Sequence, residues 1–360
     1  MIEEEFLKTL EKAKIDYVLT LPCERVKKLI SLLPSKFEIV NLSREEEGVG
    51  ISAGLYMGGK KPAMLIQSSG FGNCVNALMS LTKCYELPLP ILISWRGVYG
   101  EKIEAQKPLG ERLPRVLEAL DIEFVVFDGK NFDEVENAIK ESFEEEKIVA
   151  VLLRPDVWSE AEDFYFERPK VKRKEVRVEE CEAKMTRFEL LKTIKEELEG
   201  KIVVSNIGYP SRELYHVLDQ PTNFYMLGSM GLASSIALGV ALTGKEVISI
   251  DGDGSILMNP STLFTAGSVD VDLKILAVDN AAYGSTGNQP TASVKADLQL
   301  LAISAAFEKT FRANGEEVKE MLKEGGKVFI HFIAKPGNAK VPTIPMKAVE
   351  IKERFMEAIR

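Results

Sequence analysis

Histidine is nearly absent from this chain, which has only two, His216 and His331, among its 360 residues. A metal site built from several imidazoles is therefore excluded, and acid–base catalysis by histidine has little scope. The four cysteines include no Cys-x-x-Cys pair, so their spacing indicates neither a zinc site nor a dithiol redox site. We expect free thiols, as is usual in a reducing compartment.

An excess of positive charge is also missing. Lys and Arg number 46 against 55 Asp and Glu, a formal net charge of −9, whereas nucleic-acid-binding domains normally carry a basic patch. No run approaches the roughly 20 apolar residues of a membrane span. The chain begins Met-Ile-Glu-Glu-Glu, unlike the basic start of a signal peptide. These absences predict a cytoplasmic protein without a nucleic-acid or membrane partner.

What is present is an ordinary globular composition, 45% hydrophobic and 28% charged, with enough length for two or three domains. Short apolar runs alternate with helical patterns in both halves, which is typical of parallel sheets covered by helices on both faces. The expected strands are 17–20, 38–41, 63–67, 91–95, 123–127, 148–153, 202–205, 224–226, 247–250, 273–279 and 328–332. The expected helices are 3–14, 44–58, 71–84, 110–120, 131–145, 185–199, 231–243, 258–268, 296–306, 315–324 and 346–359.

Residues 158–183, between the two alternating regions, are mostly charged and show no apolar helical stripe. We interpret them as a linker over the surface. The sequence thus predicts an α/β protein with two doubly wound parallel-sheet domains, residues 1–157 and 184–360.

A glycine turn follows the expected strand 247–250, where the chain reads Asp251-Gly252-Asp253-Gly254-Ser255. Backbone N–H groups at such a turn before a helix favour phosphate, although a plain strand-to-helix turn would also explain the glycines. An aspartate beside a diphosphate is repulsive without a hard cation, so Asp253 suggests Mg²⁺. The next strand ends at Asp279, and Asn280 and Ala282 after it could supply a side-chain and a backbone oxygen at the same sheet edge.

The Gly-Asp-Gly motif and Asn280 form one pattern, in which Asn280 follows Asp253 by 27 positions. This pattern resembles that of the thiamine-diphosphate-dependent enzymes. The resemblance implies two domains of the thiamine-diphosphate-binding fold, the first for the pyrimidine ring and the second for the diphosphate. It implies a cofactor site that includes Gly252, Asp253, Gly254, Ser255, Asn280, Ala282, Tyr283 and Gly284, with Mg²⁺ on Asp253, Asn280 and Ala282.

Two further segments match this family. In Gly228-Ser229-Met230 the methionine would wedge under the cofactor and the carbonyl of Gly228 would accept from its aminopyrimidine, although Met230 could also simply fill a core gap. In the run Glu45-Glu46-Glu47, counting back from Ala53-Gly54 places the family's proton-sharing glutamate at Glu45. Glu46 and Glu47 remain open, because acidic residues are common at helix starts.

The chain has no middle domain, and in this it resembles the small decarboxylases of phosphonopyruvate and sulfopyruvate. The phosphonopyruvate enzymes have Gln-His where this chain has Gln106-Lys107, so the resemblance favours the sulfopyruvate enzymes, with their two subunits fused near residue 170. Candidate contacts to a dianionic substrate are Gln67, Ser68, Arg96, Lys102, Gln106 and Lys107, although exposed loop charge would explain the cations equally.

The implied reaction is thiamine-diphosphate-dependent, non-oxidative decarboxylation of 3-sulfopyruvate, a small anionic 2-oxo acid, to sulfoacetaldehyde and CO2 in coenzyme M biosynthesis. Phosphonopyruvate decarboxylation and acetolactate-synthase-like carboligation are the alternatives within the family. A non-catalytic nucleotide-binding protein is the alternative outside it. The family also implies a homodimer or homotetramer with its sites at the protomer interface.

Overall fold

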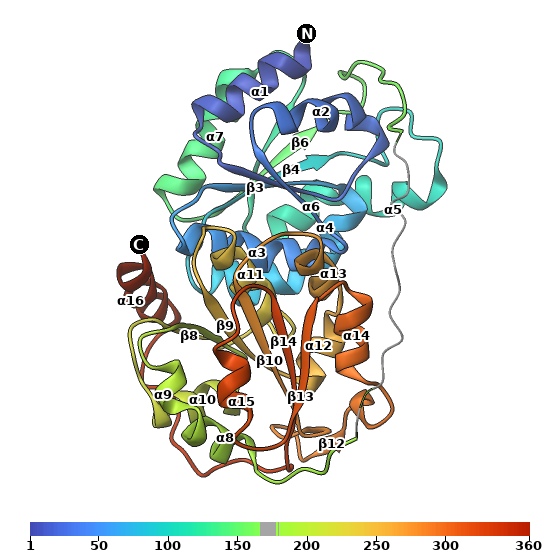
Figure 1. Ribbon diagram of the computed structural model, residues 1–360. Coiled ribbons are helices and arrows are strands. Elements are labelled where there is room, and N and C mark those ends of the chain that lie inside the picture. Colours follow the sequence, from blue (N-terminus) through green and yellow to red (C-terminus); the bar gives the residue numbers. More distant parts are fainter. Residues whose placement is uncertain (166–177, 179) are drawn as a thin grey trace.

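The computed structural model describes residues 1–165, 178 and 180–360. It contains two six-stranded parallel sheets, one from each half of the chain, stacked with helices between them (Figure 1). Among the described residues, the remaining sheet is only a two-stranded hairpin, so no middle sheet domain separates the two. The predicted fold class is confirmed. The linker 158–183 and the fusion point near residue 170 fall largely outside the described residues, and the domain boundaries stay a prediction.

The first sheet has the strand order β2-β1-β3-β4-β6-β5. Its inner strands β3, β4 and β6 are buried along nearly their whole length, which is why they are continuously apolar in sequence. Its strands are β1 (Tyr17–Thr20), β2 (Glu38–Asn41), β3 (Pro62–Gln67), β4 (Leu89–Ser94), β5 (Glu123–Phe127) and β6 (Ile148–Leu153). Its helices are α1 (Ile2–Lys12), α2 (Lys27–Leu32), α3 (Glu45–Met57), α4 (Ser68–Ala77), α5 (Lys107–Gly110), α6 (Leu113–Ala119) and α7 (Phe132–Glu144).

The second sheet has the order β13-β14-β10-β9-β7-β8. Its strands are β7 (Ile202–Ser205), β8 (Asn223–Tyr225), β9 (Val247–Gly252), β10 (Leu273–Asp279), β13 (Lys309–Ala313) and β14 (Val328–Ile333), and the hairpin is β11 (Ala282–Tyr283) with β12 (Gln289–Pro290). Its helices are α8 (Arg187–Thr193), α9 (Lys195–Leu198), α10 (Tyr209–Val217), α11 (Ala233–Ala241), α12 (Asp253–Met258), α13 (Ser261–Gly267), α14 (Leu298–Ser304), α15 (Val318–Leu322) and α16 (Ala348–Ile359). The expected elements omitted α2, α10, β13 and the hairpin, and they included only the last residue of α5 and of α12.

The two halves meet where α3 lies against α11. A Cβ atom at Gly54 would lie 2.0 Å from the carbonyl oxygen of Ile236, and one at Gly239 would lie 2.1 Å from that of Ile51. Only glycine permits this approach of two backbones. Gly50 adjoins Ser235 while Gly54 adjoins Gly239, so the helices run in the same direction and their N-termini lie at the same end.

We expect Gly54→Ala to lower the free energy of unfolding by about 1–3 kcal/mol or more, because a backbone carbonyl cannot rotate away as a side chain can. Urea unfolding followed by circular dichroism measures this change. Gly325→Ala is the control, since a Cβ there meets nothing within 4 Å and its stability should match that of the unaltered protein. Equal stability of the two variants would show that the helices can separate at no cost.

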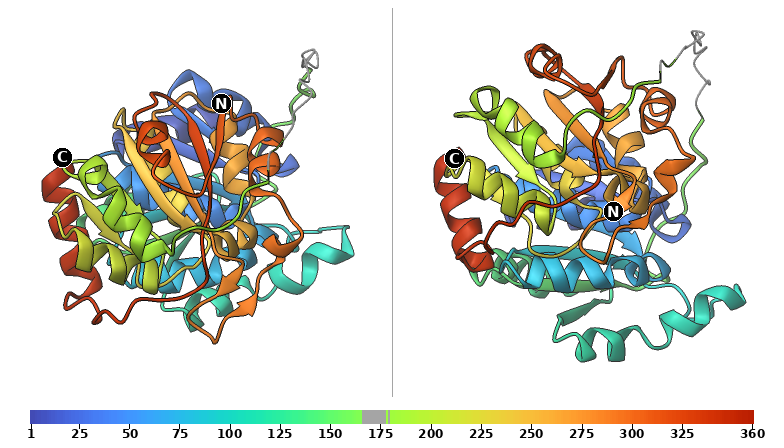
Figure 2. Two further views of the ribbon diagram at one scale, coloured as in Figure 1. Left: turned by 60° about the horizontal axis from the view of Figure 1, so that its bottom comes forward. Right: turned by 90° about the horizontal axis from the view of Figure 1, so that it is seen from below.

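The last helix, α16, packs across both halves. Its Phe355 ring packs on Phe224 of β8. The Lys352 ammonium group, although buried, donates to the carbonyl of Glu86 (3.0 Å) and to the carboxylate of Glu146 (2.6 Å) in the first half. Beyond it, Arg360 donates to the carbonyl of Tyr56 (2.8 Å). Helix α16 therefore joins the second half to the first next to the C-terminal end of α3 (Figure 2).

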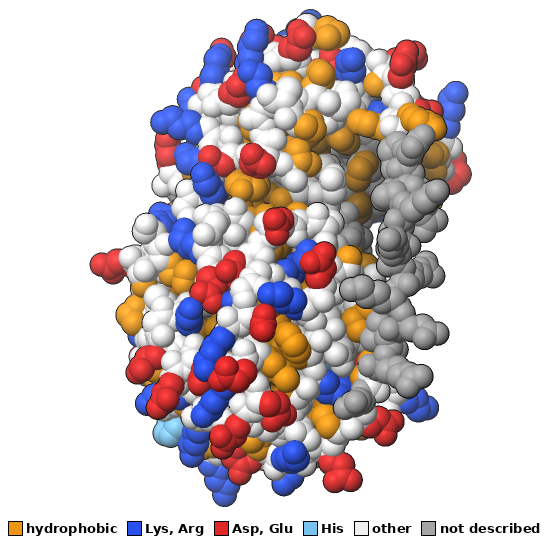
Figure 3. All heavy atoms as spheres, viewed as in Figure 1, with side chains coloured by type: hydrophobic (Ala, Val, Ile, Leu, Met, Phe, Trp, Pro, Cys, Tyr) orange, Lys and Arg blue, Asp and Glu red, His pale blue; other side chains and the backbone are white. Residues whose placement is uncertain are grey.

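The face drawn in Figure 3 carries acidic and basic side chains interspersed over both halves. In the part of the chain that the structure describes, no helix is long and apolar enough to cross a membrane.

Candidate active site

The glycine turn connects β9 directly to α12. Asp251 is buried and accepts hydrogen bonds from Ser234 Oγ and from the N–H of Gly252, both at 2.9 Å, so it holds the turn in place. Asp253, only 3% exposed, accepts from the hydroxyls of Thr291 and Ser293. A Cβ at Gly254 would lie 2.5 Å from the Tyr283 ring, so glycine is required for the hairpin to close over the turn.

The end of β10 brings a second carboxylate to this point. Ser293 Oγ donates to Asp279 at 2.8 Å and to Asp253 at 3.1 Å, so one hydroxyl bridges the two aspartates. Burial and the charge of Asp279 raise the pKa of Asp253. Burial alone would raise the pKa of Asp279, but its hydrogen bonds with His331 and Ser293 lower the pKa below its usual value. Asn280 is buried beside them, and its Oδ1 accepts from the N–H of Ala282 (3.1 Å).

These donors fit Mg²⁺. Asp253 and Asn280 offer side-chain oxygens and Ala282 offers a backbone carbonyl, and hard oxygen ligands are those that magnesium prefers. The pKa of Asp253 is raised because its negative charge is buried and lies next to that of Asp279. A bound cation would offset both effects. His331 is engaged by Asp279 at 2.8 Å and need not bind the metal.

The turn before α11 is strained and rests on the first half of the chain. Ser229 has a φ of +58°, which is uncommon for a residue with a side chain and typical of functional sites. Its Oγ lies 2.6 Å from Ser80 Oγ, and a Cβ at Gly228 would lie 2.6 Å from the Ser80 carbonyl. Nearby, Tyr85 Oη accepts from the N–H of Leu227 (2.8 Å). Met230, at the end of this turn, is half-buried.

The three glutamates at the start of α3 have different environments. Glu47 Oε1 accepts from the N–H groups of Ser43 and Arg44 and from Thr265 Oγ1, so this side chain caps the helix and contacts the second half. Burial raises the pKa of Glu47. Glu46 pairs with Arg44 at 3.3 Å.

Glu45 is 5% exposed and accepts one hydrogen bond, from Asn73 Nδ2 (2.9 Å). A Cβ at Gly70 would lie 2.2 Å from its Oε1, so glycine is needed for α4 to pack this closely. Because α3 and α11 begin at the same end, Glu45 and the turn at 228–231 lie at the same end of the helix pair. Within one chain, the two halves therefore bring Glu45, the Gly228 turn and Asp253 to the carboxyl edges of their sheets, where ligands bind in α/β folds.

The predicted substrate residues are divided by the structure. Ser68 Oγ accepts from the N–H of Arg96 (3.0 Å), which is buried at the end of β4. Gln67 and Gln106 are half-buried. Lys102 is exposed, and Lys107 pairs with Glu104 at 2.6 Å on the surface, so both stay predictions without a contact to Arg96.

The sequence analysis missed several side chains that support the site. Thr291 and Ser293 reach Asp253 only because the hairpin β11–β12 folds back over the turn, and no motif marks them. Asn73, which holds Glu45, lies in the middle of α4, after a glycine-containing segment that resembles an ordinary strand-to-helix turn.

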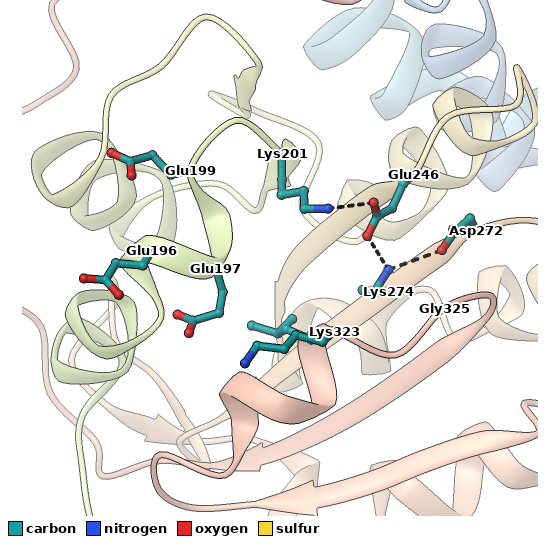
Figure 4. A pocket seen from close by; sticks show the side chains of 10 residues that line it. Glu196, Glu197, Glu199, Lys201, Glu246, Asp272, Lys274, Lys323 and Gly325 are labelled. Atoms are coloured by element: carbon teal, nitrogen blue, oxygen red, sulfur yellow. Dashed lines mark hydrogen bonds and ion pairs between the residues drawn. The ribbon is translucent and has the colours of Figure 1, made fainter.

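A hollow at the opposite edge of the second sheet does not belong to this site (Figure 4). Lys274 is buried there between Glu246 (2.6 Å) and Asp272 (3.2 Å), and Lys201 also pairs with Glu246 (2.8 Å). These residues lie at the amino ends of the strands, away from the edge where ligands bind. We interpret the cluster as a structural ion-pair network.

The fold is that of the thiamine pyrophosphate enzymes. The family model described as the N-terminal TPP binding domain of these enzymes matches residues 2–114, and the one described as the C-terminal TPP binding domain matches residues 204–332. A sulfopyruvate decarboxylase of Methanosarcina acetivorans is 42% identical over 99% of this chain and 97% of its own. The chain therefore belongs to the thiamine-pyrophosphate-dependent decarboxylases, in the family of sulfopyruvate decarboxylase.

Other relatives match one half at a time. The sulfopyruvate decarboxylase subunit beta of Methanococcus maripaludis is 46% identical over 49% of this chain and 98% of its own length. The subunit alpha of the same organism is 38% identical over 43% of this chain and 95% of its own length. Among solved structures, a thiamine diphosphate-dependent 4-hydroxybenzoylformate decarboxylase of Rhodococcus jostii RHA1 has a TM-score of 0.69 over 94% of this chain and 100% of its own. Its 12% identity shows the fold alone.

Proposed function

We propose that this protein decarboxylates 3-sulfopyruvate to sulfoacetaldehyde and CO2, using thiamine diphosphate and Mg²⁺. One observation carries the proposal, namely that the likeness to the sulfopyruvate decarboxylase of M. acetivorans extends over 99% of the chain and so includes both halves of the site. As the sequence resemblance implies, the reaction would belong to coenzyme M biosynthesis.

The second half of the chain would hold the diphosphate and the metal. Gly254 and Ser255 would offer backbone N–H groups to the diphosphate, and Gly252, whose N–H donates to Asp251, would allow its close approach. The oxygens of Asp253, Asn280 and Ala282 would bind Mg²⁺ between them and the diphosphate. Tyr283 and Gly284 would close over this group from the hairpin. In the strained turn, Gly228 and Ser229 would lie against the pyrimidine ring, with Met230 beneath the bend of the cofactor.

When bound, thiamine diphosphate supplies the electron sink for the electron pair that stays behind when CO2 leaves. Glu45 would hold a proton at its Oε1, the atom beside Gly70, while Asn73 keeps the other oxygen in place. A carboxylate in so enclosed a position can share its proton with a ring nitrogen rather than with water.

A homodimer or homotetramer with sites between protomers, and a cytoplasmic location, complete the proposal. They rest on the sequence resemblance and on composition.

We expect CO2 release from 3-sulfopyruvate that requires both thiamine diphosphate and Mg²⁺. The measurement compares 3-sulfopyruvate, 3-phosphonopyruvate and pyruvate, each with and without the two additions. Release from phosphonopyruvate alone would transfer the assignment to phosphonopyruvate decarboxylase, whose Streptomyces viridochromogenes member is 30% identical over 88% of this chain. Acetolactate formed from pyruvate, without CO2 release from either substituted acid, would indicate carboligation instead.

A further inference from the structure

Arg96 is a buried cation with an unused donor. It lies just beyond β4 and is 4% exposed. Its Nε donates to the carboxylate of Glu101, and its Nη1 lies 4.0 Å from the sulfur of Cys23. Among the described residues, its Nη2 has no hydrogen-bond partner although it is buried. A buried guanidinium donor without a partner is costly, so its presence indicates a ligand that completes the set.

A second arginine faces the same carboxylate. Arg25 follows β1, and its Nη2 lies 3.8 Å from Glu101 Oε1, with the Arg25 side chain 39% exposed. Glu101 Oε1 also accepts from the N–H of Ile103 (3.0 Å). The hydrogen bond from Arg96 lowers the pKa of Glu101 to about 2, so this carboxylate is ionised at neutral pH. Glu101 therefore lies between two guanidinium groups, one buried and one open to solvent.

This cluster lies at the edge of the first sheet that also carries Glu45. Ser68 Oγ accepts from the N–H of Arg96, and two residues along α4 Gly70 lies against Glu45. Cys23, after β1, lies 3.2 Å from Ser94 Oγ at the end of β4. The two guanidinium groups thus lie at the same sheet edge as Glu45, the carboxylate to which we assign the proton, and a substrate with a charge one carbon from its reacting ketone would need both.

The net charge of the cluster matches one kind of substituent. Two arginines and one ionised glutamate sum to +1. A sulfonate carries one negative charge, whereas a phosphonate, like a phosphate, carries up to two near neutral pH. Planar guanidinium groups bind the oxygens of such groups in a fixed geometry, more selectively than a lysine does.

We propose that Arg96 and Arg25 form the subsite for the terminal sulfonate of the substrate and that Glu101 sets its selectivity for a singly charged group. This inference rests on the proposed function. Arg96 is already a candidate substrate contact from the sequence, and the structure adds Arg25 and Glu101 to it. Cys23 closes the subsite on its inner side, next to Ser94. The subsite does not include Lys102, which is exposed, or Lys107, which is half-buried and pairs with Glu104.

The selectivity is tested with Glu101→Gln. Glutamine keeps the size of the side chain and one acceptor oxygen, which can serve Arg96 Nε, and it raises the charge of the cluster by one. We expect the ratio of kcat/KM for 3-sulfopyruvate to that for 3-phosphonopyruvate to fall at least tenfold. Glu104→Gln removes the same charge from the exposed part of this loop and should leave the ratio unchanged. An unchanged ratio in Glu101→Gln, or an equal change in Glu104→Gln, would overturn the role of Glu101.

Sulfonate binding is tested separately with Arg25→Gln, a half-exposed position that puts folding at little risk. We expect KM for 3-sulfopyruvate to rise at least tenfold with kcat within about twofold, while Arg112→Gln, at an exposed arginine outside the predicted site, changes neither. Calorimetry with 3-sulfopropanoate, which cannot lose CO2, should show weaker binding to Arg25→Gln, with propanoate as the ligand without a sulfonate.

The two proposals can fail separately. If the unaltered protein does not decarboxylate 3-sulfopyruvate, the proposed function fails, and the calorimetry still tests the subsite. If the reaction occurs but Arg25→Gln binds 3-sulfopropanoate as the unaltered protein does, the subsite is elsewhere and the function stands.

Discussion

Replacing Glu45 with glutamine is expected to lower kcat for decarboxylation between about 10²- and 10⁴-fold, the range typical of a lost proton-transfer group. Glutamine preserves the shape of the side chain and its contact with Asn73, so the fold and cofactor binding should persist. The measurement is steady-state CO2 release at saturating thiamine diphosphate, with cofactor affinity determined by fluorescence quenching on the same samples.

The neighbouring glutamates are the matched controls. Glu46→Gln loses only an ion pair with Arg44 at the helix start, and we expect activity within about twofold of the unaltered protein. Glu47→Gln should act on stability instead, because this side chain caps α3 and binds Thr265 of the second half. Full activity in Glu45→Gln, or an equal loss in Glu46→Gln, would show that the proton-sharing carboxylate has been misassigned.

Asp253→Asn is expected to weaken Mg²⁺ binding in the presence of thiamine diphosphate by at least about 100-fold. Loss of an outer-shell partner alone commonly costs 10–100-fold in metal affinity, and Asp253 would be a direct ligand. Activity should then return only in part at high Mg²⁺. Titration of Mg²⁺ into protein with thiamine diphosphate, followed by calorimetry and by CO2 release, measures both quantities.

Asp272→Asn controls for the loss of one negative charge from the same half of the chain. Asp272 lies at the opposite edge of the sheet, where it pairs with Lys274 (3.2 Å), and its replacement should leave metal affinity unchanged. Magnesium affinity that is the same in Asp253→Asn and in the unaltered protein would place the metal on other residues.

Most of both sheets could be predicted from the sequence because their inner strands are buried on both faces and so are continuously apolar. β13 was missed for the opposite reason. It is an edge strand, Lys309–Ala313, in which charged, polar and apolar residues are mixed and most side chains are partly exposed. Helix α2 is only six residues long, too short to show a helical period.

Within the site, the motif residues could be identified by sequence, but their supports could not. Which of three adjacent glutamates faces the cofactor depends on hydrogen bonds from Asn73 and Thr265, both far away along the chain. The glycines of α3 resemble a stripe of small residues, and only the fold shows that they admit the backbone of a helix about 185 residues later. The arginine pair at Glu101 likewise joins β1 to β4 through space.

The contacts of α16 bear on the origin of the single chain. Lys352 and Arg360 hold the first half from the far end of the second, while the backbones of α3 and α11 hold it at the centre. The halves are thus associated by surfaces that would exist equally in two separate polypeptides. The covalent connection between the halves is then not needed to hold them together. Its consequence concerns stoichiometry, because a single chain supplies both halves in equal number. Relatives with separate alpha and beta subunits must instead produce two polypeptides in matching amounts.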